Sequence, residues 1–109
     1  MAPMRPCHLL LPVLLFASSA ALADTSANLV IRNRAFEPSE LNVPAGQKIE
    51  LHVRNEDAAA SEFESSSLHR EKVVPAGKEV VVNVGPLRAG RYEFFDDFNP
   101  KARGHIVAK

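Results

Sequence analysis

The stretch that decides the fold is residues 44–54, which reads Pro-Ala-Gly-Gln-Lys-Ile-Glu-Leu-His-Val-Arg. A turn is followed by strict alternation, with Ile49, Leu51 and Val53 on one side and charged or polar residues on the other. Because successive side chains of a β-strand point to opposite faces, this pattern predicts a strand with one face in a core and one in water.

Similar short segments fill the rest of the chain. Pro75-Ala76-Gly77 repeats the turn, and no window shows helical periodicity over three turns. Short strands separated by Pro and Gly, without the spacing of βαβ units, predict an all-β domain: an antiparallel Greek-key β-sandwich of about seven or eight strands. The expected strands are 29–34, 39–43, 47–54, 61–64, 70–74, 79–84, 91–96 and 104–109. The segment 35–38 is expected to break the sheet, because Pro38 has no N–H to donate and restricts the residue before it.

Residues 1–23 have the pattern of a secretory signal peptide. Arg5 precedes the apolar run 9–16, and Ala21-Leu22-Ala23 is the A-x-A pattern of a processing site, so we expect cleavage before Asp24. The apolar run is shorter than the roughly 20 residues of a transmembrane helix. We therefore expect a soluble periplasmic domain over residues 24–109, with no direct membrane insertion.

Charge and cysteine content exclude several classes of protein. Without residues 1–23 the chain keeps 12 Lys and Arg, 13 Asp and Glu, and three His. A domain without a basic excess lacks the electrostatic footprint of a nucleic-acid-binding protein. Cys7, the single cysteine, lies in the expected leader. The mature protein should then hold no disulfide, thiolate metal site or cysteine nucleophile.

Three stretches together resemble the cupredoxin family. Residues 36–46 are similar to its opening strand pair, Asn55-Glu56-Asp57 to its Asn-x-Asp loop, and the segments 92–96 and 104–107 to its closing hairpin. The resemblance extends from Asn28 to Lys109. It implies the cupredoxin-like Greek-key sandwich over nearly the whole mature chain.

The resemblance also implies that the copper ligands of blue-copper members are replaced. The family's cysteine falls on Asp96, its two histidines on Ser61 and Asn99, and its methionine on Ala102. A type 1 centre needs a thiolate and two imidazoles. The chain thus resembles a cupredoxin frame without that centre.

The segments 62–65, 70–72 and 94–98 are similar to the EfeO-type periplasmic cupredoxin-like subgroup, which is associated with ferrous iron uptake. In that subgroup the acidic pair is typically followed by Phe-His, whereas this chain has Phe98-Asn99. The resemblance implies an accessory protein that binds an iron or copper ion, or helps to oxidise it, and transfers it to a membrane permease. The implied partners are an inner-membrane iron permease and other periplasmic iron-uptake proteins.

A carboxylate-rich metal site is the functional hypothesis. Asp96 has the same strand parity as Tyr92 and Phe94, so it should point inward, where an unpaired carboxylate is costly unless a cation neutralises it. Oxygen ligands with an imidazole suit Fe(II), Mn(II) or Cu(II) outside a type 1 centre. His105 is an alternative nitrogen ligand. The predicted metal ligands are Asp96, Asp97, Glu62, Glu64, Asn99 and His69.

Simpler roles remain open for the same acids. Asp96 and Asp97 can accept loop N–H groups or pair with Lys101 and Arg103. Phe63 should take the core side of its strand and turn Glu62 and Glu64 outward, where Arg70 and Lys72 could face them across a hairpin. The corresponding alternative function is a metal-free interaction module that docks on a periplasmic or membrane partner. The sequence predicts no catalytic residues, and Ser65-Ser66-Ser67 lacks the elbow motif of a hydrolase.

Overall fold

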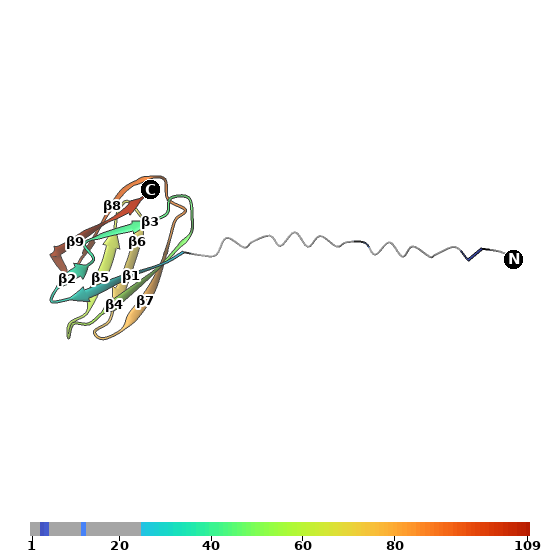
Figure 1. The fold of residues 1–109 in the computed structure, drawn as a ribbon. Helices are drawn as coiled ribbons and strands as arrows, with labels where there is room; N and C mark the ends of the chain where they lie inside the picture. The colour runs from blue at the N-terminus through green and yellow to red at the C-terminus, as the bar shows by residue number, and fades with distance from the viewer. Residues whose placement is uncertain (1–2, 5–11, 13–24) are drawn as a thin grey trace.

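Nine β-strands of the described part of the chain form two sheets that pack face to face (Figure 1). The structure is a computed structural model and describes residues 3–4, 12 and 25–109. Apart from residues 3–4 and 12, the predicted signal peptide lies outside the described residues, as does its cleavage site. Among the residues described, no helix has the length and apolar character needed to cross a membrane.

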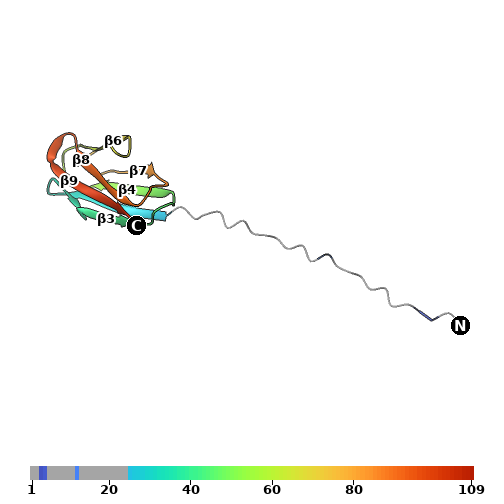
Figure 2. The same ribbon diagram turned by 90° about the horizontal axis from the view of Figure 1, so that it is seen from above.

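The two sheets contain four and five strands, seen from above in Figure 2. The first sheet has the order β2-β1-β4-β7, with β2 Ala35–Glu37, β1 Thr25–Arg32, β4 Ile49–Asn55 and β7 Glu79–Val84. The second sheet has the order β3-β9-β8-β5-β6, with β3 Glu40–Val43, β9 Asn99–Ala108, β8 Gly90–Asp96, β5 Ser61–Ser65 and β6 Arg70–Val74.

The predicted all-β sandwich is confirmed, but its sheets are not purely antiparallel. β1 pairs with β4 in parallel, and β3 pairs with β9 in parallel. The chain between β1 and β4 crosses to the second sheet as β3, which allows β4 to return in the direction of β1. Alternation has the same period in both kinds of sheet, so the pattern could not distinguish them.

The structure also has more strands than the seven or eight predicted, since there are nine in the described residues. The segment before Pro38, which we expected to break the sheet, forms the short strand β2 antiparallel to β1. Asn33 and Arg34, with φ of 51° and 59°, form the turn between these two strands. This conformation is costly for residues other than glycine. The Asp57 carboxylate accepts both of their N–H groups, at 2.9 and 2.8 Å, and thereby stabilises the turn.

Aromatic and branched side chains between the sheets form the core. The ring centroid of Phe36 in the first sheet lies 4.9 Å from that of Phe94 in the second, in an edge-to-face arrangement. The ring centroid of Phe63 lies 5.3 Å from that of Phe94. Burial of one such side chain contributes about 1.5–3 kcal/mol. Because Phe63 and Phe94 occupy the core side of β5 and β8, alternate residues on these strands face outward. This alternation positions the acidic residues described next.

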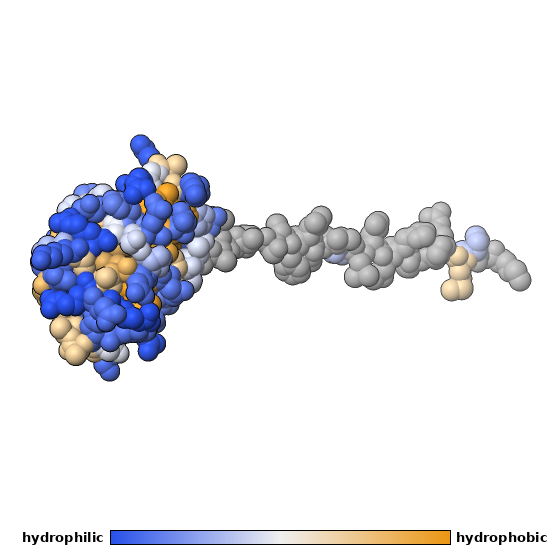
Figure 3. Space-filling model, turned by 60° about the vertical axis from the view of Figure 1, so that its left-hand side comes forward, coloured by the Kyte–Doolittle hydropathy of each residue, from blue (hydrophilic) through white to orange (hydrophobic). Residues whose placement is uncertain are grey.

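The surface of the domain is mostly hydrophilic on the face shown in Figure 3, with smaller apolar areas between the polar ones. Within residues 25–109, the large apolar side chains that remain well exposed are those of Val73, Val81 and Phe98. Both Pro-Ala-Gly turns end in a glycine with positive φ, +76° at Gly46 and +70° at Gly77. Glycine adopts this conformation without steric cost, so both turns have the same physical basis.

Candidate metal centre

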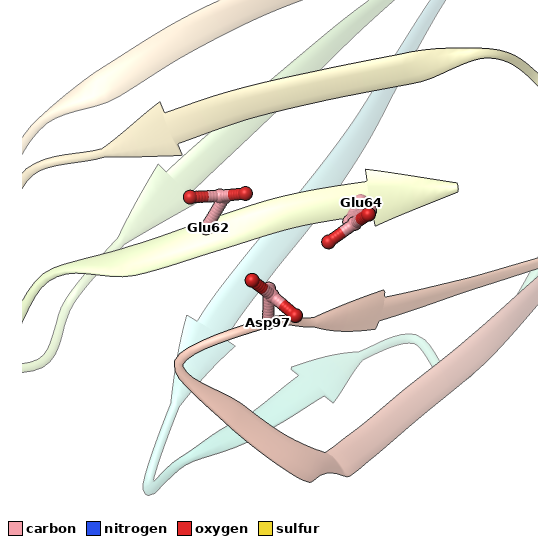
Figure 4. Close-up of side chains that lie close together, drawn as sticks. All are labelled: Glu62, Glu64 and Asp97. Carbon is pink, nitrogen blue, oxygen red and sulfur yellow. The ribbon is translucent and has the colours of Figure 1, made fainter. Parts of the chain in front are cut away.

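Three carboxylates converge on the outer side of the second sheet. Glu62 and Glu64 project from β5, and Asp97 projects from the turn that follows β8 (Figure 4). One oxygen of each residue can be chosen so that all three lie within 4.8 Å of one another. We refer to these three residues as the acidic triad.

The position of the acidic triad follows from strand alternation and one main-chain contact. Phe63 is fully buried in the core, so Glu62 and Glu64 on either side of it face outward. The Asp97 N–H donates to the main-chain oxygen of Glu62 at 2.9 Å. This hydrogen bond holds the turn after β8 against β5 and brings the third carboxylate to the first two.

The spacing of the acidic triad suits a cation of ordinary size. Three oxygens at most 4.8 Å apart can all lie within about 2.8 Å of a common centre. Ca²⁺ binds oxygen at about 2.3–2.6 Å and Mg²⁺ at about 2.0–2.1 Å. Side-chain movements of a few tenths of an ångström to about 1 Å would therefore give bonding distances.

Glu62 is the most unusual member of the triad. Its side chain is on the outer side of the sheet, yet the residue is only 8% exposed, and its Oε1 atom accepts no hydrogen bond from the described residues. A hydrogen bond shared with Glu71, burial, and the negative charges of Glu71, Asp97 and Glu64 raise the pKa of Glu62 to about 7. A buried carboxylate without a donor is costly, so this oxygen is suited to a cation.

Among the described residues, the acidic triad has no close counter-ion. In the part of the chain that the structure describes, none of the ion pairs within 4.0 Å involves Glu62, Glu64 or Asp97. Burial and the charges of Asp97 and Glu71 raise the pKa of Glu64. The acids thus repel one another when ionised.

The alternative in which Arg70 and Lys72 face Glu62 and Glu64 across the hairpin does not match the register of the strands. Glu64 lies directly opposite Glu71, and Lys72 lies opposite Phe63. Glu71 is the residue that the sequence reasoning missed. A four-residue connection over 66–69, which aligns Ser65 with Arg70, would have predicted this register.

Asp96 lies apart from the acidic triad. It points inward as predicted and is 2% exposed, but its Oδ1 atom accepts the N–H groups of Glu62 and Phe98, both at 2.9 Å. It lines a small hollow of about 40 Å³ together with Ser61 and Asn99, which are other positions that the resemblance assigns to ligands. The predicted ligands therefore do not form one group. Asp96 and Asp97 are consecutive residues, so their side chains point in opposite directions.

The other two predicted ligands are also outside the triad. Asn99 donates from Nδ2 to the Arg34 main-chain oxygen at 3.2 Å, next to the hollow of Asp96. His69, with φ of 53°, ends the turn before β6 and lines an outer hollow of about 430 Å³ with Glu64 and Glu71. The Ser65 hydroxyl supports this turn, since it accepts the N–H of Leu68 at 3.2 Å.

The loop before β5 is held by Asn55. Its buried Nδ2 donates to the main-chain oxygens of Ala59 and Val74, at 2.8 and 3.1 Å, and its Oδ1 accepts the N–H of Asp57 at 2.9 Å. The motif Asn55-Glu56-Asp57 thus has a structural role. It fixes the start of β5, from which Glu62 and Glu64 project.

The two face-to-face sheets, with parallel pairs β1–β4 and β3–β9, define a β-sandwich protein of the cupredoxin type. The chain belongs to the cupredoxin-like domain family, whose family model matches residues 7–108. Over 80 residues it is 39% identical to the uncharacterised protein RP394 of Rickettsia prowazekii (strain Madrid E). That match covers 72% of this chain and 64% of the relative, so the chain spans about two thirds of its length.

Solved cupredoxin structures share the fold at low sequence identity. Auracyanin A, a blue copper protein of Chloroflexus aurantiacus, is similar with a TM-score of 0.67 and 16% identity, over 79% of this chain and 99% of its own. A purple cupredoxin of Nitrosopumilus maritimus is similar with a TM-score of 0.63 and 16% identity, over 76% of this chain and 99% of its own. The metal-binding domain of the Cu(I)-exporting ATPase CopA of Streptococcus pneumoniae D39 is similar with a TM-score of 0.63 and 15% identity. The match covers 77% of this chain and 84% of that domain.

Proposed function

We propose that this protein is a periplasmic metal-binding protein, whose acidic triad binds a divalent cation and delivers it to a membrane permease. The observation that carries the proposal is the buried, unpartnered Oε1 atom of Glu62, with the carboxylates of Glu64 and Asp97 beside it and no close counter-ion in the described chain. An oxygen-only set of donors suits the hard cation Mn(II), and carboxylates also bind the borderline cation Fe(II). Fe(II) is the cation that the EfeO-type resemblance favours.

Three further observations support parts of this proposal. The leader pattern of residues 1–23 supports export. The ligand positions of blue-copper relatives hold Ser61, Asp96, Asn99 and Ala102, which supports a site other than type 1 copper. In Streptococcus pneumoniae a domain of this fold is the metal-binding domain of a Cu(I)-exporting ATPase, so delivery between such a domain and a membrane transporter is a reasonable role.

Calorimetric titration of Fe(II), without oxygen, and of Mn(II) tests this function. We expect dissociation constants in the micromolar range for the unmodified protein, within the wide range of oxygen-only sites. The double variant Glu62→Gln, Asp97→Asn should lose binding. Glu93→Gln is the matched control, because Glu93 lies on the same sheet and is paired with Arg103 at 2.7 Å. Binding no tighter than millimolar, or equal binding by the double variant, would reject the proposal.

A metal-free interaction module is the second candidate. The capped carboxylate of Asp96 favours it, since two main-chain N–H groups occupy Oδ1 at the position where the resemblance places a copper ligand. Phe98, 52% exposed beside the same hollow, offers an apolar contact for a partner. This candidate predicts that neither Fe(II) nor Mn(II) binds to the unmodified protein.

A further inference from the structure

Glu71 is a fourth carboxylate at the edge of the acidic triad. It lies on β6, which is an edge strand of the second sheet, directly opposite Glu64 on β5. Like charges at directly opposite positions of an antiparallel pair destabilise it. The arrangement therefore costs stability unless a cation or a proton lies between the two acids.

Glu71 is also close to the most buried member of the triad. Glu62 is its diagonal neighbour across the β5–β6 pair, and the nearby Glu71 carboxyl group raises the pKa of Glu62. The Cα atoms of such diagonal neighbours on paired strands are about 7–8 Å apart, within reach of two glutamate side chains. The carboxyl groups of Glu71, Glu62 and Asp97 thus form a continuous group with Glu64.

Glu71 connects this group to solvent. It is exposed, and it lines the outer hollow of about 430 Å³ with Glu64 and His69. Arg70 also lines this hollow, with its guanidinium group bound to the main-chain oxygens of Asn83 and His69. Asp97 and Glu62 are not among the lining residues, so Glu64 and Glu71 are the carboxylates that a hydrated ion meets there. Glu71 is therefore placed where a cation exchanges waters for protein oxygens.

We propose that Glu71 is the fourth carboxylate ligand of the cation site, on the side from which a hard divalent cation enters. The inference rests on the proposed function, because it adds a ligand to the acidic triad. Hard divalent cations take six or more oxygen ligands, so three carboxylates leave positions for Glu71 and for water. The buried Oε1 atom of Glu62 accepts no hydrogen bond from the described residues, so this oxygen is free to bind a cation.

Mn²⁺ titration followed by electron paramagnetic resonance tests the role of Glu71. Free Mn²⁺ gives a strong signal that is lost on binding, so the titration yields the affinity. We expect Glu71→Gln and Glu71→Val to weaken Mn²⁺ binding about tenfold or more, because ligand charge sets the affinity of oxygen-only sites. Glu79→Gln is the matched control, since Glu79 is an exposed glutamate on β7, the edge strand of the other sheet.

Water-proton relaxation separates a ligand from a distant charge. If Glu71 binds the ion, a water molecule replaces it in Glu71→Val, and the relaxivity of bound Mn²⁺ rises above that of the unmodified complex. Unchanged affinity in both Glu71 variants, or weaker binding with unchanged relaxivity, would overturn the inference while the proposed function stands. Failure of Glu62→Gln to weaken binding, or no Mn²⁺ binding by the unmodified protein, would overturn both.

Discussion

The main-chain N–H of Glu62 donates to the buried carboxylate of Asp96 at 2.9 Å, while the Glu62 side chain lies with Asp97 in the acidic triad. One residue of β5 therefore links two acidic neighbours that follow each other along the chain. Asp96 accepts hydrogen bonds from main-chain N–H groups. Asp97 lies in the acidic triad and has no close counter-ion among the described residues. This division gives Asp96 a structural role and leaves Asp97 to the proposed cation site.

Removal of the Asp96 carboxylate should destabilise the fold without preventing cation binding at the proposed site. Asp96→Ala deprives the N–H groups of Glu62 and Phe98 of their acceptor, and hydrogen bonds to charged groups contribute about 1.5–3 kcal/mol each. We expect a loss of about 2–4 kcal/mol in the free energy of unfolding, measured with urea. Asp96→Asn keeps an acceptor oxygen and should lose less. Complete loss of Mn²⁺ binding by a folded Asp96→Asn protein would contradict this division of roles.

The stability of the metal-free protein should fall as the pH rises. Glu62 has a pKa of about 7 in the folded protein and an ordinary value of 4.5, so between these values the folded state binds more protons than the unfolded chain. Its contribution is fully present below about pH 4.5 and is lost as the pH rises through about 7. The raised pKa of Glu64 acts in the same direction.

Urea unfolding at about pH 5 and about pH 8, with a chelator present, measures this dependence. Glu62→Gln does not titrate, so its stability should fall less over the same interval. Because Glu62→Gln removes one charge from the acidic triad, the variant should also be more stable than the unmodified protein at the higher pH. An equal pH dependence in the two proteins would show that Glu62 has an ordinary pKa in the folded state.

Gly104 has no space for a side chain. A Cβ atom there would lie 2.5 Å from Cζ of Phe94 and 2.7 Å from the main-chain oxygen of Ser39. Since Phe94 is fully buried between Phe36 and Phe63, it cannot move away freely. We expect Gly104→Ala to lower the free energy of unfolding by about 1–3 kcal/mol. Ala108→Gly on the same strand serves as a comparison that adds no atoms. If the Gly104→Ala protein were as stable as the unmodified one, the core around Phe94 would be looser than the structure shows.

Copper loading should give no blue centre. Type 1 absorption requires a cysteine thiolate and two imidazoles, and the positions that the resemblance assigns to these ligands hold Asp96, Ser61 and Asn99. We expect the full chain with added Cu(II) to show only the weak visible absorption of oxygen and nitrogen ligands. An intense visible band would reveal a sulfur ligand and contradict the proposed oxygen-only site.

Much of the fold could be predicted from local patterns. Alternation at Ile49, Leu51 and Val53 identified a core-facing strand, and all three residues are buried. The parallel pairing of β1 with β4 depends on how the chain crosses between sheets, which no local pattern records. The strand β2 was missed because Pro38 follows it, and the prediction extended the effect of proline to residues before it.

The candidate site was only partly accessible from the sequence. The outward orientation of Glu62 and Glu64 followed from Phe63 in the core, and the inward orientation of Asp96 followed from Phe94. The sequence reasoning nevertheless joined inward and outward acids in one shell. The pairing register was needed to bring Glu71 rather than a basic residue opposite Glu64, and register depends on the length of the turn before β6.

Anomalous diffraction from crystals soaked in Mn²⁺ tests the central claim most directly, because it locates the ion. The account predicts one strong anomalous peak between the carboxylates of Glu62, Glu64 and Asp97, with Glu71 moved toward it. No peak at the triad, or a peak only in the hollow lined by Asp96, Ser61 and Asn99, would contradict the account.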